Sequence, residues 1–174
     1  MLIGGSLGAR TINESVLKHL DLIRQHSNIQ FIWQTGKYYS AEIAERLKDC
    51  QPDNLVVTDF ISDMGAAYKA ADLVISRAGA GSISEFCLLG IPVILVPSPN
   101  VAEDHQTKNA LALVNKEAAL YVKDREAEKL LLPMAIDTVQ DAAKLKSLSE
   151  NILKMALPDS ADIIAKEVIK LAEQ

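Results

Sequence analysis

Gly4, Ser6 and Gly8 are the first residues whose types and spacing could do chemistry. Their spacing matches the G-x-S-x-G pattern of a hydrolase nucleophile elbow, in which a tight turn from strand to helix exposes a serine. The same glycine-rich turn could instead offer backbone N–H groups to a phosphate at the start of a helix. Ser6 is a nucleophile in the first interpretation and a ligand contact in the second.

The hydrolase interpretation needs an acid and then a histidine after the serine, and Asp72 and His105 supply that order. A nucleophile elbow, however, follows a central strand and takes an oxyanion-hole N–H from the loop of an earlier strand. The sequence begins at Met1 and offers no earlier loop, and residues 1–3 are shorter than an ordinary strand of about five residues. We therefore prefer the phosphate interpretation of this turn, and we expect the chain to begin partway through a larger protein.

A second glycine-rich stretch, residues 77–82 (RAGAGS), follows an apolar run and opens a predicted helix. Gly79 and Gly81 would let another molecule approach the backbone, and the free N–H groups of a helix N-terminus suit a diphosphate. Ser82 could add a hydroxyl, and Glu85, one turn into the helix, could accept hydrogen bonds from a ribose diol. Ser82-x-x-Glu85 is also a capping box, which would explain the same two residues without a ligand. The residues alone leave both interpretations open.

Strand-like and helix-like segments alternate along the chain, which predicts an α/β fold with a doubly wound parallel sheet. The continuous apolar run in residues 73–76 predicts a strand buried on both faces, and Gly90 is expected to end the helix that starts at Ser82. The expected strands cover residues 29–34, 55–58, 73–76, 92–96 and 119–122. The expected helices cover residues 9–26, 40–50, 64–71, 82–89 and 104–116 and, at the C-terminal end, 126–136, 141–155 and 160–172.

Ligands bind to such a sheet at the carboxyl ends of its strands, so the loops that follow strands form the candidate site. Four loops qualify: residues 4–8, 59–64, 77–82 and 97–106. Residues 59–61 could also be an ordinary loop with a buried aromatic ring. His105 could be an ordinary polar residue in the first turn of a helix.

Length and composition limit the classes of protein. The 174 residues suit one domain, 1–174, with a sizeable core, and a net charge of -5 argues against a nucleic-acid partner. No apolar run reaches the ~18 residues that span a bilayer, and no signal peptide is evident. Cys50 and Cys87 form no CxxC pair and are expected to be free thiols in a reducing cytoplasm. No metal site is expected, because no ligand-type spacing is present.

Five motifs in order, GGSLGA, DFISDM, SRAGAGSISE, GIPVILVPSP and DHQTKNA, make nearly the whole chain resemble the C-terminal domain of the MurG family of peptidoglycan N-acetylglucosaminyltransferases. These enzymes are GT-B glycosyltransferases, which have two Rossmann-like domains. The resemblance implies a domain that holds UDP-N-acetylglucosamine in an inverting transferase. The acceptor is a lipid-linked muramyl-pentapeptide, undecaprenyl-pyrophosphoryl-MurNAc-pentapeptide, at the cytoplasmic face of the bacterial inner membrane, where the full protein is peripheral.

The resemblance also implies roles for single residues. It implies phosphate contacts from Gly5 and Ser6 in the first turn, and a uracil pocket of Phe60 and Ile61, with Met64 packing nearby, in which Ile61 reads the base edge through its backbone. It also implies that Ala80, Gly81 and Ser82 form a diphosphate-binding turn and that Glu85 is a ribose-binding acid. His105 and Gln106 would be a polar pair at the sugar hydroxyls. No cofactor and no catalytic residue are expected in this chain.

The N-terminal domain of the family, which binds the lipid acceptor and carries the proposed catalytic base and the membrane-binding patch, has no counterpart in this sequence. We therefore expect the chain to be soluble and to bind the donor without transferring sugar. Two alternatives remain: another GT-B enzyme such as a UDP-N-acetylglucosamine 2-epimerase, and a serine esterase that uses Ser6.

Overall fold

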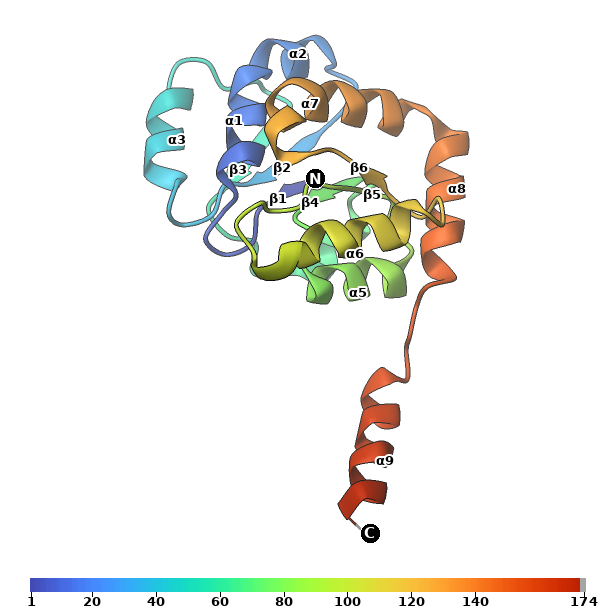
Figure 1. Cartoon of the computed structure of the whole chain (residues 1–174). Coiled ribbons are helices and arrows are strands. Elements are labelled where there is room, and N and C mark those ends of the chain that lie inside the picture. The colour runs from blue at the N-terminus through green and yellow to red at the C-terminus, as the bar shows by residue number, and fades with distance from the viewer. Residues whose placement is uncertain (173–174) are drawn as a thin grey trace.

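Six short strands pair in parallel in the computed structural model, which describes residues 1–172 (Figure 1). The order across the sheet is β3-β2-β1-β4-β5-β6, which is the order of a doubly wound Rossmann-like sheet. The predicted fold class is therefore confirmed. The strands are β1 (Leu2–Ile3), β2 (Phe31–Gln34), β3 (Leu55–Thr58), β4 (Val74–Ser76), β5 (Val93–Leu95) and β6 (Leu120–Tyr121).

The two-residue strand β1 lies at the centre of the sheet, although its length argued against a core strand. Leu2 is in register with Trp33 of β2 on one side and with Ile75 of β4 on the other. All three residues of β4 are buried, as the continuous apolar run predicts. The glycine-rich turn after β1 therefore starts from the middle of the sheet.

One face of the sheet is covered by α1 (Arg10–Lys18), α2 (Leu20–Gln25), α3 (Ser40–Leu47) and α7 (Asp124–Gln140). Trp33 is fully buried beneath α1, and its Nε1 donates to Asn13 Oδ1 at 3.0 Å. Asn13 Nδ2 in turn donates to the carbonyl of Thr35 at 2.9 Å, so this buried polar chain ties the end of β2 to α1.

The opposite face is covered by α4 (Met64–Lys69), α5 (Ala80–Leu89), α6 (His105–Val114) and α8 (Ala142–Leu153), with a short 3-10 helix η1 (Ala102–Asp104) before α6. Phe86 of α5 and Ile152 of α8 are fully buried in this second core. Gly90 ends α5 in the left-handed conformation, with φ 66°, as predicted.

Several predicted helix boundaries are wrong, and the helix expected over residues 40–50 ends at Leu47. The helix expected over residues 9–26 is broken at His19, because the apolar pattern continues across a break between two helices that pack on the same core. Helix α5 begins at Ala80 rather than Ser82, with Gly79 as the N-cap. Helix α7 extends to Gln140 and contains Pro133.

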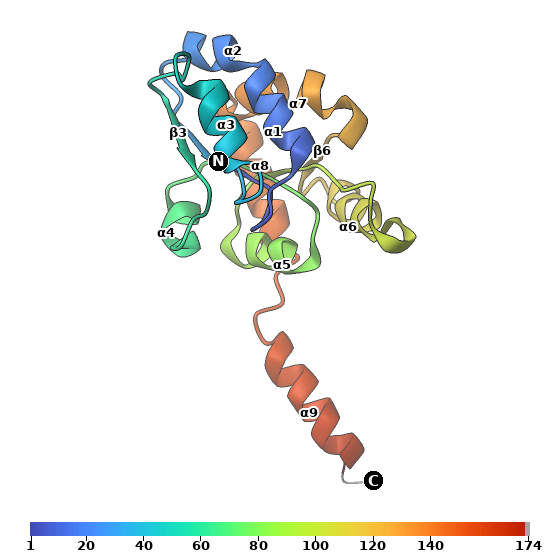
Figure 2. The ribbon, with the colours of Figure 1, turned by 90° about the vertical axis from the view of Figure 1, so that its left-hand side faces the viewer.

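Helix α9 (Ser160–Ala172) stands away from the rest of the domain in both ribbon views (Figures 1 and 2). None of its side chains is buried, and its apolar side chains are exposed, including those of Ile164, Val168 and Leu171. Over residues 1–172 no helix combines the length and the hydrophobicity needed to cross a membrane.

Candidate functional site

A hollow of about 260 Å³ lies at the carboxyl ends of β1 and β4. These neighbouring strands lead to helices on opposite faces of the sheet, α1 and α5, so their ends form the topological switch point where doubly wound folds bind ligands. Seven of the predicted site residues line this hollow: Gly5, Ser6, Phe60, Ile61, Met64, Ser82 and Glu85. It is also lined by Ile3, Gly4, Gln34, Tyr68, Ser76, Arg77 and Gly79.

The turn after β1 is held open by its own backbone. Gly8 N–H donates to the carbonyl of Gly5 at 3.0 Å, and both glycines have a positive φ, 79° at Gly5 and 88° at Gly8. A Cβ on Gly8 would lie 2.2 Å from the carbonyl oxygen of Thr35, so glycine is needed there for close packing against β2. The Ser6 side chain remains exposed, and the residue before α1, Ala9, makes no side-chain cap. The first backbone N–H groups of α1 therefore have no side-chain cap.

The turn after β4 presents a second open helix N-terminus. Gly79 is the N-cap of α5 in an extended conformation, with φ −72° and ψ 141°, and it has no side chain to cap the first N–H groups. A Cβ added to Gly79 or Gly81 would meet no heavy atom within 4 Å, so there is free space in front of this turn. Ser82 is the third residue of the helix, not its N-cap. The capping-box interpretation of Ser82 and Glu85 is therefore wrong.

Glu85 is held by a residue that the sequence reasoning missed. The hydroxyl of Tyr68, in α4, donates to Glu85 Oε2 at 2.9 Å. The Tyr68 ring is buried and packs edge-on against Phe86, with ring centroids 5.7 Å apart. Burial, and then the hydrogen bond to Glu85, raise the pKa of Tyr68 above its ordinary value, so the phenol stays protonated and remains a donor. The spacing from Met64, four residues earlier, could have placed Tyr68 on the same face of the helix as that predicted site residue, although it does not predict the bond to Glu85.

The loop after β3 places an aromatic ring and free backbone groups at the hollow. Thr58 Oγ1 donates to the carbonyl of Phe60 at 2.9 Å, and the Phe60 ring, 46% exposed, has Lys37 Nζ 5.5 Å from its centroid. Within residues 1–172 the backbone N–H and carbonyl of Ile61 make no hydrogen bond. Phe60 is therefore not the buried aromatic of an ordinary loop, and Ile61 keeps a donor and an acceptor for a ligand.

His105 and Gln106 are the first two residues of α6, after the loop that follows β5, and their side chains make different contacts. Gln106 Oε1 accepts hydrogen bonds from the backbone N–H groups of Ala78, at 3.2 Å, and Ser98, at 2.9 Å. His105 is exposed, with Nδ1 2.8 Å from the carbonyl oxygen of Ala102. Neither residue lines the hollow, so a shared contact to a sugar stays a prediction. Gln106 already holds the loops after β4 and β5 together.

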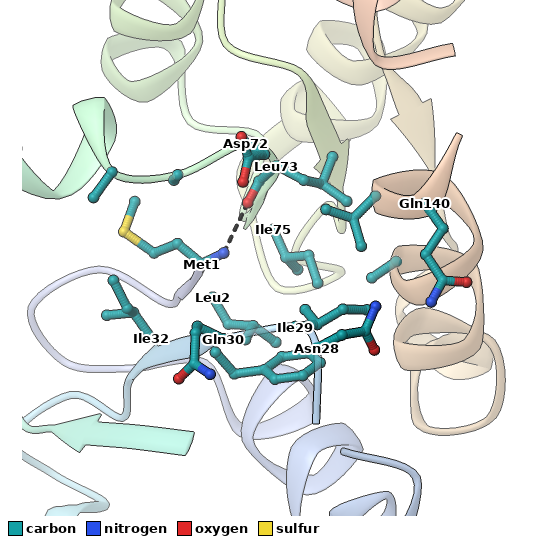
Figure 3. Close-up of a pocket in the computed structure, with 15 residues that line it drawn as sticks. Met1, Leu2, Asn28, Ile29, Gln30, Ile32, Asp72, Leu73, Ile75 and Gln140 are labelled. Atoms are coloured by element: carbon teal, nitrogen blue, oxygen red, sulfur yellow. Dashed lines mark hydrogen bonds between the residues drawn. The ribbon is translucent and has the colours of Figure 1, made fainter. Parts of the chain in front are cut away.

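A larger cavity, about 670 Å³, lies at the opposite edge of the sheet, where the strands begin (Figure 3). It is lined by Met1, whose amino group donates to the carbonyl of Leu73 at 2.7 Å, and by Asp72, which precedes β4. Its wall is formed mainly by strand starts and offers no glycine-rich turn, so we favour the smaller hollow as the functional site. Because Asp72 and Ser6 lie at opposite edges of the sheet, the triad of Ser6, Asp72 and His105 is wrong.

A doubly wound parallel sheet with two glycine-rich turns at its switch point defines a Rossmann-like domain. The family model described as the glycosyltransferase family 28 C-terminal domain matches residues 1–165. The chain therefore belongs to glycosyltransferase family 28, as its C-terminal domain.

Curated relatives agree with this family. The chain is 69% identical over 175 residues to a Bacteroides fragilis protein named UDP-N-acetylglucosamine--N-acetylmuramyl-(pentapeptide) pyrophosphoryl-undecaprenol N-acetylglucosamine transferase, covering all of this chain and 46% of that protein. It is 67% identical over 174 residues to a Bacteroides thetaiotaomicron protein of the same name, covering 99% of this chain and 47% of that protein. The chain thus spans about half the length of the curated relatives it matches. Their names do not favour the 2-epimerase alternative.

Solved structures give the same fold. The crystal structure of MurG from Acinetobacter baumannii superposes with a TM-score of 0.81 at 29% identity, covering 97% of this chain and 48% of that one. The glycosyltransferase SnogD from Streptomyces nogalater gives a TM-score of 0.60 at 18% identity, covering 98% of this chain and 43% of that one, and shows the shared fold alone. The predicted resemblance to one half of a GT-B glycosyltransferase is confirmed.

Proposed function

We propose that this chain is the donor-binding domain of an N-acetylglucosaminyltransferase of peptidoglycan synthesis and that it binds UDP-N-acetylglucosamine at the hollow between β1 and β4. The observation that carries this proposal is the meeting of three loops at the switch point, with two open glycine-rich turns beside a carboxylate. The names of the relatives support UDP-N-acetylglucosamine as the sugar nucleotide and a lipid-linked muramyl-pentapeptide as the acceptor.

The diphosphate is expected between the two turns. Gly5 and Ser6 approach it from the end of β1, and Ala80, Gly81 and Ser82 approach it from the first turn of α5. An uncapped helix N-terminus carries free N–H groups and a partial positive charge, which favour an anion. The free space in front of Gly79 and Gly81 lets the phosphate oxygens reach those N–H groups.

The nucleoside is expected beside the loop after β3. The backbone of Ile61 has an unused donor and an unused acceptor, which suit the edge of uracil. Phe60 and Met64 supply apolar walls for the base. Glu85 has one carboxylate oxygen bonded to Tyr68, and the other is available to the ribose diol.

The sugar is assigned to the side of the loop after β5. His105 is exposed, and Gln106 keeps its amide N–H groups although its oxygen is bonded to Ala78 and Ser98. Gln106 can therefore donate to a sugar hydroxyl if the donor extends from the hollow toward α6. With Nδ1–H donating to the Ala102 carbonyl, the Nε2 atom of His105 can accept a hydrogen bond from a second hydroxyl.

Acceptor binding and the chemical step belong, in this proposal, to the part of the longer protein that this chain does not cover. The relatives are about twice as long, and their names specify a lipid-linked acceptor, undecaprenyl-pyrophosphoryl-MurNAc-pentapeptide. The proposal accordingly includes that the whole enzyme acts at the cytoplasmic face of the inner membrane as a peripheral protein, where such an acceptor would be reached. The proposed reaction is inverting: the acceptor oxygen forms a bond to the anomeric carbon as the bond from that carbon to the diphosphate of UDP breaks on the opposite face, and a general base outside this chain takes the proton of the acceptor hydroxyl.

Calorimetric titration of this chain tests the proposal, with UDP-N-acetylglucosamine, UDP-glucose and ADP-glucose as ligands. We expect binding of both UDP-sugars, tightest for UDP-N-acetylglucosamine, and no measurable binding of ADP-glucose. The matched control variant is Asp72→Asn, which changes the larger cavity at the other edge and is expected to leave every affinity unchanged. Equal affinity for UDP-glucose and ADP-glucose contradicts the assignment of the uracil pocket.

A further inference from the structure

The hydrogen bond between Tyr68 and Glu85 joins two helices at the wall of the hollow. Tyr68 is in the last turn of α4 and Glu85 is in the middle of α5, and the hydroxyl-to-carboxylate distance is 2.9 Å. Both residues line the hollow. The bond therefore lies within the proposed nucleotide site and is not a distant contact of the scaffold.

The position of the Tyr68 hydroxyl is fixed by its ring. The Tyr68 side chain is 6% exposed, and it packs edge-on at 82° against Phe86, which is fully buried. A tyrosine has two side-chain dihedral angles, and burial of its ring leaves the hydroxyl little freedom. Glu85, in contrast, is an exposed side chain with three rotatable bonds, which would otherwise sample several rotamers.

We infer that Tyr68 is a positioning residue for the donor's ribose, because it holds one oxygen of Glu85 and turns the other toward the ribose diol. This inference rests on the proposed function, in which Glu85 binds the ribose. The protonated phenol suits the role, since burial raises the pKa of Tyr68 and keeps it a donor. Without Tyr68 the carboxylate would have to be ordered when the nucleotide binds, and the entropy of that ordering would reduce affinity.

A purely structural role gives a different expectation. A hydrogen bond that only ties α4 to α5 would affect stability and would weaken all nucleotides equally. A positioning role affects ligands that carry the ribose diol and spares ligands that lack it. The comparison of UDP with 2′,3′-dideoxy-UDP separates the two roles.

The test is calorimetric titration of this chain and its variants with both nucleotides. Tyr68→Phe keeps the ring and its packing on Phe86 and removes the hydroxyl. We expect it to weaken UDP about 3- to 10-fold, the range for one lost hydrogen bond, and to leave dideoxy-UDP unchanged. Tyr121→Phe is the matched control, because Tyr121 lies in β6 and does not line the hollow, and it should change neither affinity.

The variant Glu85→Gln separates the inference from the proposed function. We expect it to weaken UDP more than Tyr68→Phe does, and Tyr68→Phe added to it should cause no further loss, since the two residues act through one contact. If Glu85→Gln weakens UDP selectively but Tyr68→Phe weakens neither nucleotide, or both nucleotides equally, the inference about Tyr68 is overturned and the proposed site stands. If Glu85→Gln leaves UDP affinity unchanged, or the parent chain does not bind UDP, the proposed function fails and the inference fails with it.

Discussion

Arg77 and Asp124 form a largely buried ion pair that joins the candidate site to the start of α7. Arg77 Nη1 donates to Asp124 Oδ1 and also to the carbonyls of Val96, at 3.1 Å, and Pro97, at 3.2 Å. Thr11, in α1, donates to the second oxygen of Asp124 at 2.9 Å. The Asp124 carboxylate and the Arg77 guanidinium therefore connect the loops after β4 and β5 to α1 and α7, which cover the face of the sheet opposite to α5 and α6.

Replacing Asp124 by alanine should destabilise the domain by about 2–4 kcal/mol, because it leaves the Arg77 charge largely buried without its carboxylate. Each of the two side chains keeps about a fifth of its surface exposed, 18% and 19%, which places the cost below that of a fully enclosed pair. Urea unfolding measures the change in the free energy of unfolding. Glu126→Ala, which removes the exposed pair with Arg125 in the same turn of α7, is the control and should cost about 1 kcal/mol or less. Equal losses for the two variants would contradict the role given to the buried pair.

Alanine at Gly81 and alanine at Gly8 should change the free energy of unfolding in opposite directions. At Gly81 a Cβ meets no atom within 4 Å, so Gly81→Ala should raise the free energy of unfolding by about 0.5–1 kcal/mol, as expected for alanine in a helix. The same methyl group occupies the space assigned to the diphosphate, so UDP affinity should fall about 5- to 100-fold, the range for overfilling a packed space.

Gly8→Ala is the matched comparison for that prediction. Its Cβ would lie 2.2 Å from the Thr35 carbonyl oxygen, and its φ of 88° is strained for alanine, so it should destabilise the domain by about 2 kcal/mol or more. Thermal unfolding and calorimetric titration of both variants measure these effects. Unchanged UDP affinity in a folded Gly81→Ala variant would remove the diphosphate from the N-terminus of α5.

The sequence predicts this fold well where the signal is local. The apolar run of β4 and the glycine at position 90 identified a buried strand and a helix end, and both are confirmed. The break at His19 has no local signal, because Ile12, Val16 and Ile23 keep one apolar face across it. The predicted start of α5 is also wrong. Serine is a more common N-cap than glycine, which favoured a start at Ser82, but the extended backbone at Gly79 makes that residue the N-cap and Ala80 the first residue of the helix.

The candidate site was predictable in its loops and not in its tertiary contacts. The parallel sheet order brings the ends of β1 and β4 together, so Gly5 and Ser82 could be placed on the same hollow from sequence. The bond from Tyr68 to Glu85 joins residues 17 positions apart on different helices, and no spacing rule predicts it. The inward turn of Gln106 toward Ala78 likewise depends on how α6 packs against the loops.

Selectivity for uridine should come from the backbone of the loop after β3. Ile61→Val keeps the backbone and should leave UDP affinity nearly unchanged. Insertion of a glycine after Phe60 displaces the Ile61 N–H and carbonyl and should abolish the preference for UDP over ADP. Insertion of a glycine after Asp49, in an exposed turn that follows α3, is the control and should preserve the preference. Retention of uridine selectivity after the Phe60 insertion would show that other groups read the base.

The 174-residue chain should bind the donor and catalyse no transfer. Holding the acceptor hydroxyl in line with the anomeric carbon can account for ~7–11 kcal/mol of a barrier, and a general base adds about 10²–10⁴-fold. In our proposal both contributions come from the remainder of the longer protein. The measurement is a transfer assay with labelled UDP-N-acetylglucosamine and a soluble acceptor analogue, run on this chain and on the full-length protein. Turnover by this chain at a rate near that of the full-length protein would place the catalytic groups among these residues.

The location of the donor site is tested most directly by nuclear magnetic resonance of the ¹⁵N-labelled chain during titration with UDP-N-acetylglucosamine. The account predicts saturable amide shifts at the two glycine-rich turns and the loop after β3, including Ser6, Ile61 and Gly81. It predicts no shifts around the larger cavity at the other edge of the sheet, as reported by Gln30 and Asp72. Shifts that cluster at Gln30 and Asp72, or no shifts at either edge at a saturating ligand concentration, would contradict the donor site at the carboxyl ends of β1 and β4.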